Sequence, residues 1–163
     1  MSGYDIAQVC LNGHVTNDSY RNFPQRNKKF CDKCGEPTIT KCPKCETAIR
    51  GKYHARGVSS IGFTYHPPAF CHECGQPYPW TTSKIEAAKK MAMELEDISK
   101  EDREILAKSF DDMIRDSPEA TLAATRFKRI ISKVGKPVME EFRELIVDIA
   151  SETAKKIIMQ EHT

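Results

Sequence analysis

The chain has 163 residues, of which 29% are charged, and a formal net charge of +2, which suits one domain or two small ones. We expect no membrane span, because no run of about 18 apolar residues occurs. The start of the chain also lacks the basic residues and apolar core of a secretion signal, which favours a cytoplasmic protein. In a reducing compartment, paired cysteines hold metal more often than they form disulfides.

The composition changes near Trp80 and divides the chain into two parts. All seven cysteines lie before residue 75, while the second part is rich in Ala, Glu, Lys, Ile and Met. Residues 1–80 carry a formal charge of +4 and residues 81–163 a charge of −2. We therefore predict an α+β protein with two domains. A small zinc-ribbon domain of short β-hairpins and zinc knuckles (1–80) precedes an all-α bundle of three to four helices (81–163).

The seven cysteines and one histidine form four pairs of candidate metal ligands. Residues 31–37 and 71–77 repeat each other at an offset of 40 residues, each as Cys-x-x-Cys followed by Gly and then Pro. Each repeat follows another ligand pair, of the form Cys-x-x-x-His or Cys-x-x-Cys. Two residues between cysteines allow both sulfurs to face one metal from a single tight turn. The pattern predicts two structural Zn²⁺ ions with the ligands Cys10, His14, Cys31, Cys34, Cys42, Cys45, Cys71 and Cys74.

The order of the pairs favours two successive sites over a cross-brace, in which the first and third pairs would share one zinc. Cross-braces usually bring the second and third pairs within a few residues, but seven residues separate Cys34 from Cys42. His66 or His72 could replace His14, although Cys-x-x-x-His gives the better local geometry. Four protein ligands, mainly thiolates, close the metal's coordination shell, as in structural sites. We expect the first half to unfold without metal, because it has little other apolar material.

A long insert, 46–70, separates the two cysteine pairs of the second site. Basic side chains alternate along it, so a strand would place them on one face, with residues 63–65 returning as the partner strand. Such a hairpin could contact phosphates and bases, which makes nucleic acid a possible partner. The alternative is a solvated hairpin with a charged outer face. The predicted contact residues are Arg50, Lys52, Tyr53, His54 and Arg56.

From Thr81 the apolar pattern becomes helical. It predicts helices that begin near Thr81, after Ser99, and at Ser117-Pro118, and a last helix from Pro137 to about Gln160. The last helix would be about 36 Å long. Its apolar stripe either crosses the bundle or meets another chain, so a protein partner or a homo-oligomer is possible. No catalytic motif occurs along these helices, and we expect no enzyme.

With these ligand pairs, the chain resembles a bacterial family of small uncharacterised proteins that have an N-terminal double zinc ribbon and a helical C-terminal region. The resemblance extends over most of the chain. It implies metal binding in a bacterial cytoplasm and supplies no known activity. Our interpretation is a non-enzymatic, zinc-binding interaction or adaptor protein. The alternative is a nucleic-acid-binding regulator that uses the basic hairpin 50–56.

Overall fold

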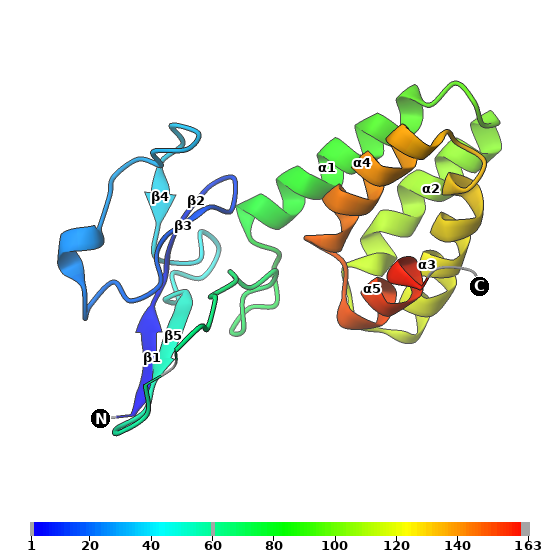
Figure 1. The fold of residues 1–163 in the computed structure, drawn as a ribbon. Helices are drawn as coiled ribbons and strands as arrows, with labels where there is room; N and C mark the ends of the chain where they lie inside the picture. Colours follow the sequence, from blue (N-terminus) through cyan, green and yellow to red (C-terminus); the bar gives the residue numbers. More distant parts are fainter. Residues whose placement is uncertain (1, 60, 161–163) are drawn as a thin grey trace. The chain divides into compact units, whose positions relative to one another are not determined.

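The structure is a computed structural model that describes residues 2–59 and 61–160. It divides into two compact units, Met1–Thr82 and Ser83–Thr163. In the described chain, the strands all lie in the first unit, and the second unit is helical (Figure 1). The predicted α+β class is therefore confirmed, with five helices in place of the expected three to four. None of the described helices is long and apolar enough to cross a membrane.

The first unit contains two small antiparallel sheets. One pairs β1 with β5, and the other has the strand order β3-β2-β4. The strands are short because the turns that carry the cysteine pairs interrupt them. Their bounds are β1 (Gly3–Ile6), β2 (Gln8–Cys10), β3 (Val15–Asn17), β4 (Thr38–Ile39) and β5 (Arg50–His54), and a single 3₁₀ turn covers Pro24–Arg26.

The core of the first unit is small and contains two of the predicted metal ligands. The rings of Tyr78 and Trp80 stack with centroids 4.6 Å apart, and both side chains are buried. Around them lie other buried side chains, namely Ala7, Val9, Ile49 and the thiols Cys42 and Cys71. Because Cys42 and Cys71 are part of this core, the second cysteine cluster and the apolar core of the first unit pack together.

Glycine at position 51 allows β5 to lie close to two backbone segments, the end of β1 at Ile6 and the residue after β3, Asp18. A Cβ atom on Gly51 would lie 2.3 Å from the carbonyl oxygen of Asp18 and 2.7 Å from the carbonyl carbon of Ile6. The next residue, Lys52, donates its backbone N–H to the same Asp18 oxygen at 2.7 Å. Only glycine fits this approach of two backbones.

The second unit has its core where three phenylalanine rings meet. The ring centroid of Phe110 lies 6.2 Å from that of Phe127 and 6.4 Å from that of Phe142. The predicted cap of the second helix is confirmed, since the Ser99 hydroxyl accepts the N–H of Asp102 at 3.1 Å. The helices are α1 (Pro79–Glu94), α2 (Lys100–Met113), α3 (Pro118–Ile131), α4 (Lys136–Val147) and α5 (Glu152–Met159).

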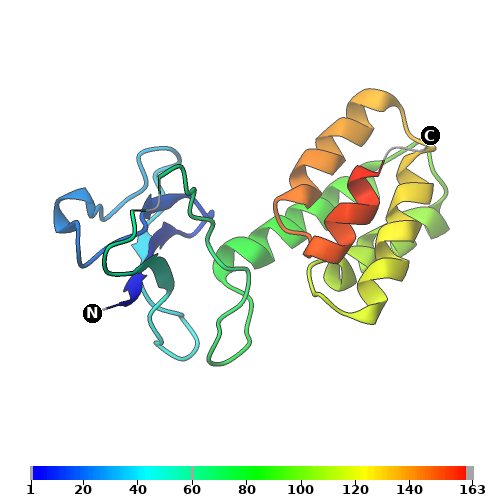
Figure 2. The same cartoon turned by 60° about the horizontal axis from the view of Figure 1, so that its bottom comes forward.

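The prediction of one long last helix is wrong. The chain leaves the helix after Val147 and begins α5 at Glu152, so that α5 packs against α3 (Figure 2). Ser151 explains the break, because its hydroxyl accepts the N–H of Ala154 at 3.2 Å as a helix cap. Its own N–H donates to the carbonyl of Met113 at 2.8 Å. The second part of the apolar stripe, on α5, therefore packs against α3 within the same unit.

The predicted start of the first helix is also displaced. Helix α1 begins at Pro79, so Thr81 lies inside its first turn and does not cap it. The hydroxyl of Thr81 donates instead to the carbonyl of Ala69 at 2.8 Å. Proline fits the first turn of a helix because its missing N–H would have no partner there.

Candidate metal centres

The eight predicted ligands come together in two clusters of four. Cys10, His14, Cys31 and Cys34 form the first, and Cys42, Cys45, Cys71 and Cys74 form the second. In each cluster the ligand atoms all lie within 4.8 Å of one another. This is the arrangement of successive sites, and the cross-brace is excluded. Neither His66 nor His72 belongs to a cluster of the described residues.

The distances within both clusters fit tetrahedral zinc. At Zn–S and Zn–N bond lengths of about 2.3 and 2.05 Å, neighbouring ligand atoms lie roughly 3.5–3.8 Å apart. In the first cluster, His14 Nδ1 is 3.5 Å from Cys10 Sγ and 3.6 Å from Cys31 Sγ. In the second, the Cys42–Cys74 and Cys45–Cys71 sulfur pairs are 3.8 and 3.6 Å apart. These sulfurs are too far apart for disulfides, and all seven thiols are free. Each cluster could therefore hold one zinc ion.

The three Cys-x-x-Cys turns share one backbone conformation. In each, the N–H of the first cysteine donates to the carbonyl five residues on, and its carbonyl accepts the N–H four residues on, at 2.8–2.9 Å. The residue after the second cysteine has positive φ, which is 76° at Gly35, 69° at Gly75 and 61° at Glu46. In the turn of Cys42 and Cys45, the residue at this position is Glu46 and not glycine. Glu46 nevertheless takes the same left-handed conformation, with a strain that glycine avoids.

Backbone amides favour the thiolate form of the first cysteine in two of these turns, those of Cys31 and Cys71. The N–H of Cys74, followed by that of Glu73, donates to Cys71 Sγ and lowers its pKa to about 6. At Cys31, burial opposes ionisation, but the N–H groups of Lys33 and Cys34 lower the pKa of the thiol overall. Because zinc binds thiolates, these amides prepare the turns for the metal.

The Cys10–His14 arm of the first cluster is a tight turn at the end of β2. The N–H of His14 donates to Cys10 Sγ at 3.3 Å, so the backbone supports the sulfur here as well. Gly13 has φ of 88°, and a Cβ atom there would lie 2.9 Å from Cβ of Trp80. The turn of the first cluster thus packs against a residue of the core that surrounds the second cluster.

The hydroxyl of Tyr78 lies beside the second cluster. It is buried, and it forms no hydrogen bond of normal distance and angle with any of the described residues. Burial and then the neighbouring thiol of Cys71 raise the pKa of this hydroxyl. Tyr78 therefore keeps its proton, and its O–H is a donor available to the sulfur ligands.

The face predicted to carry Arg50, Lys52, His54 and Arg56 does not include Arg50, whose guanidinium lies over the Tyr4 ring. Strand β5 pairs with β1, with Tyr4 opposite Tyr53 and Gly3 opposite His54, so Tyr53 and His54 point to opposite sides, as the alternation predicts. His54 Nε2 lies 3.3 Å from the Ser19 hydroxyl and 3.9 Å from the buried carboxylate of Asp5. A register shift between Tyr4 and Ile6 changes the direction of the side chain at the Arg50 end of β5.

As a result, Arg50 lies on the side of the tyrosines. Its guanidinium is 5.2 Å from the centroid of the Tyr4 ring. The predicted return strand 63–65 does not form, because β1 takes its place beside β5. Pro67 and Pro68 follow that segment and have no N–H for a ladder. No pattern in the sequence points to Tyr4, because its role depends on a pairing between segments nearly 50 residues apart.

The chain belongs to the family described as "Uncharacterized protein conserved in bacteria (DUF2321)", whose model matches residues 3–158. The match covers both units, in agreement with the resemblance noted from the cysteine pairs. No curated protein and no solved structure matches the chain.

Proposed function

We propose that the chain is a non-enzymatic, zinc-binding interaction protein of the bacterial cytoplasm, in which two structural zinc ions hold a binding surface in shape. The donor sets support a structural role. Each cluster supplies four protein ligands, mainly thiolates, which would leave no coordination position open for water or substrate.

Ser19, His54 and Asp5 in the first unit do not form a nucleophilic relay. Ser19 and Asp5 both approach the same nitrogen, Nε2, of His54, whereas a Ser-His-Asp relay needs one partner at each ring nitrogen. Ser19 is buried, and its hydroxyl donates to the Asp18 carboxylate. This geometry supports binding as the function in preference to catalysis.

The observation that carries the proposal is a tyrosine patch, defined as Tyr4, Arg50 and Tyr53. Tyr4 and Tyr53 are 56% and 51% exposed, and their rings meet edge to face, with centroids 5.0 Å apart. Arg50 lies over the Tyr4 ring, and exposed Tyr and Arg side chains are common at the centres of protein interfaces. The adjoining insert exposes further large apolar side chains, namely Val58, Ile61 and Phe63.

The helical unit contributes to partner binding less directly in this proposal. The apolar stripe that suggested a second chain is folded back, and its members Phe142, Ile146 and Ile158 are buried within the unit. A partner of this unit would meet other exposed side chains, such as Met159, which is 56% exposed.

Affinity capture from the bacterial host tests the proposal when the patch is varied. The zinc-loaded wild type should retain a protein that the Tyr4→Ala/Tyr53→Ala variant loses, and nuclease treatment should not change the result. Leu122→Ala is the matched control, because it removes an exposed apolar side chain from the other unit. Equal capture by the wild type and the patch variant would contradict the proposal.

Nucleic-acid binding is the second candidate, because stacked bases and phosphates also suit exposed tyrosines beside an arginine. The zinc ions weaken the electrostatic case. With two Zn²⁺ and their thiolates included, the charge of residues 1–80 falls from a formal +4 to about +1. Fluorescence anisotropy with a single-stranded oligonucleotide at several salt concentrations tests this candidate. Binding that falls steeply with salt, and a slope that flattens in Arg50→Ala/Lys52→Ala/Arg56→Ala, would support it.

A further inference from the structure

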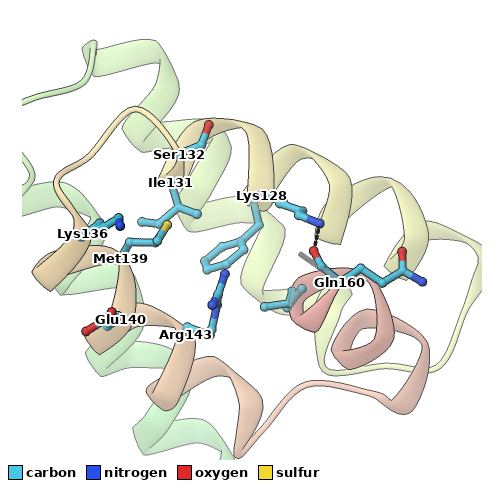
Figure 3. A pocket seen from close by; sticks show the side chains of 10 residues that line it. Lys128, Ile131, Ser132, Lys136, Met139, Glu140, Arg143 and Gln160 are labelled. Atoms are coloured by element: carbon cyan, nitrogen blue, oxygen red, sulfur yellow. Dashed lines mark hydrogen bonds between the residues drawn. The ribbon is translucent and has the colours of Figure 1, made fainter. Parts of the chain in front are cut away.

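The helical unit contains a pocket that the proposed function does not use. It has a volume of about 310 Å³ and is lined by residues of α3, α4 and α5 and of the segments that follow α3 and α5 (Figure 3). This volume is at the lower end of the range of small-molecule sites and is too small for a helix or a whole phospholipid. A small ligand is therefore the occupant that fits.

The inner wall of the pocket is apolar. Phe127, Ile131 and Ile158 line it and are each at most 4% exposed, so their positions are fixed by the core. Met139 adds a half-buried thioether. Such a wall accepts an alkyl chain and offers no partner to a polar group placed deep in the pocket.

The rim of the pocket is cationic. Lys128, Lys136 and Arg143 line it against a single carboxylate, Glu140. Figure 3 shows Arg143 extending from α4 toward the middle of the pocket, with Glu140 nearer the edge. Lys128 donates to the backbone carbonyl of Gln160. Lys136 and Arg143 have no carboxylate within 4.0 Å in the described part of the chain.

The pocket holds an excess of cations, with three basic side chains against one carboxylate. The second part of the chain carries 17 acidic against 15 basic residues, so carboxylates are not scarce. An excess of cations beside an apolar wall is complementary to a ligand with one anionic end and one apolar end.

We propose that this pocket binds a medium-chain acyl carboxylate, with the carboxylate at Arg143 and Lys136 and the alkyl chain against Phe127 and Ile131. The neutral wall excludes a second charge on the ligand, and the small volume limits the length of the chain. This binding is independent of the tyrosine patch and of the zinc clusters.

Calorimetric titration of the full, zinc-loaded chain tests the proposal without any variant. Decanoate should bind, 1-decanol should bind at least tenfold more weakly, and inorganic phosphate should not bind measurably. Octanoate should bind about tenfold more weakly than decanoate, because two buried methylenes are lost. No binding of decanoate, or equal binding of decanoate and decanol, would overturn the proposal.

Variants then locate the site. Arg143→Met and Lys136→Met should each weaken decanoate binding about tenfold and leave decanol binding unchanged. Arg126→Met is the matched control, because Arg126 is an exposed cation of α3 outside the pocket. Met139→Trp should block binding by filling the cavity. If decanoate affinity fell as much in Arg126→Met as in Arg143→Met, the ligand would be attracted by general charge and the proposed site would be wrong.

Discussion

The two units reach a folded state by different physical means. In the first unit, eight metal ligands hold short strands around a core in which two of the seven buried members are thiols. In the second, apolar side chains from successive helices meet around Phe110, Phe127 and Phe142 without any cysteine. The comparison teaches that stability in the first unit depends on metal, whereas in the second it depends on apolar area. Each of the following changes should therefore affect one unit and spare the other.

Removing zinc with a chelator should have the largest effect. Structural zinc contributes on the order of 10 kcal/mol per site, so the first unit should unfold while the helical circular dichroism signal persists. Trp80 is the single tryptophan and is buried beside the second cluster, so its fluorescence should shift to the red. Loss of the helical signal at the same chelator concentration would show that the units do not differ in this way.

Phe127→Ala should destabilise the second unit by about 3–5 kcal/mol, because it empties the centre of the helical core. Urea unfolding followed by circular dichroism measures this change. The zinc content and the Trp80 fluorescence of the native protein should stay the same. Leu122→Ala, at an exposed position on the same helix, should cost less than about 0.5 kcal/mol.

Gly51→Ala should destabilise the first unit by roughly 1–3 kcal/mol, the usual cost of overpacking. The added Cβ would lie 2.3 Å from a backbone oxygen, and backbone cannot yield as a flexible side chain can. The midpoint of the Trp80 fluorescence transition in urea should fall. Gly3→Ala is the control, since a Cβ atom at Gly3 would meet nothing within 4 Å, and it should change little.

Substitutions at the positive-φ positions should have the smallest effects and opposite signs. Gly75→Ala should cost about 1 kcal/mol, and the cost is conformational because a Cβ atom there would meet nothing within 4 Å. Glu46→Gly should raise the free energy of unfolding by up to about 1 kcal/mol, because it relieves a left-handed residue. The same Trp80 transition measures both. A loss of stability in Glu46→Gly would mean that the side chain of Glu46 matters more than its backbone.

The metal clusters could be predicted from the sequence because their geometry is local. Each Cys-x-x-Cys pair closes its own turn, and the spacing of the pairs favoured the successive order that the structure has. The partner of β5 could not be predicted in this way. The pairing of Tyr4 with Tyr53 joins distant segments, and the register shift that brings Arg50 over Tyr4 leaves no periodic signal.

The same contrast between local and distant contacts explains which features of the helical unit could be predicted from the sequence. The cap at Ser99 and the start of α3 at Pro118 depend on neighbouring residues and were predicted correctly, although the side chain of Ser117 makes no capping hydrogen bond. The break at Ser151 was missed because the apolar pattern runs through it without interruption. A contact from Ser151 to the distant carbonyl of Met113 accompanies the turn. The pocket between α3, α4 and α5 exists only because of this fold-back.

The contact between Gly13 and Trp80 has a consequence for how the metals load. Gly13 belongs to the Cys10–His14 turn, and Trp80 stacks on Tyr78 in the core that contains Cys42 and Cys71. When zinc binds to one cluster, it therefore fixes the position of Gly13 or Trp80, and the other cluster packs against that residue. The second ion should bind more tightly than the first, so at half-saturating zinc the population should consist mainly of empty and doubly loaded molecules.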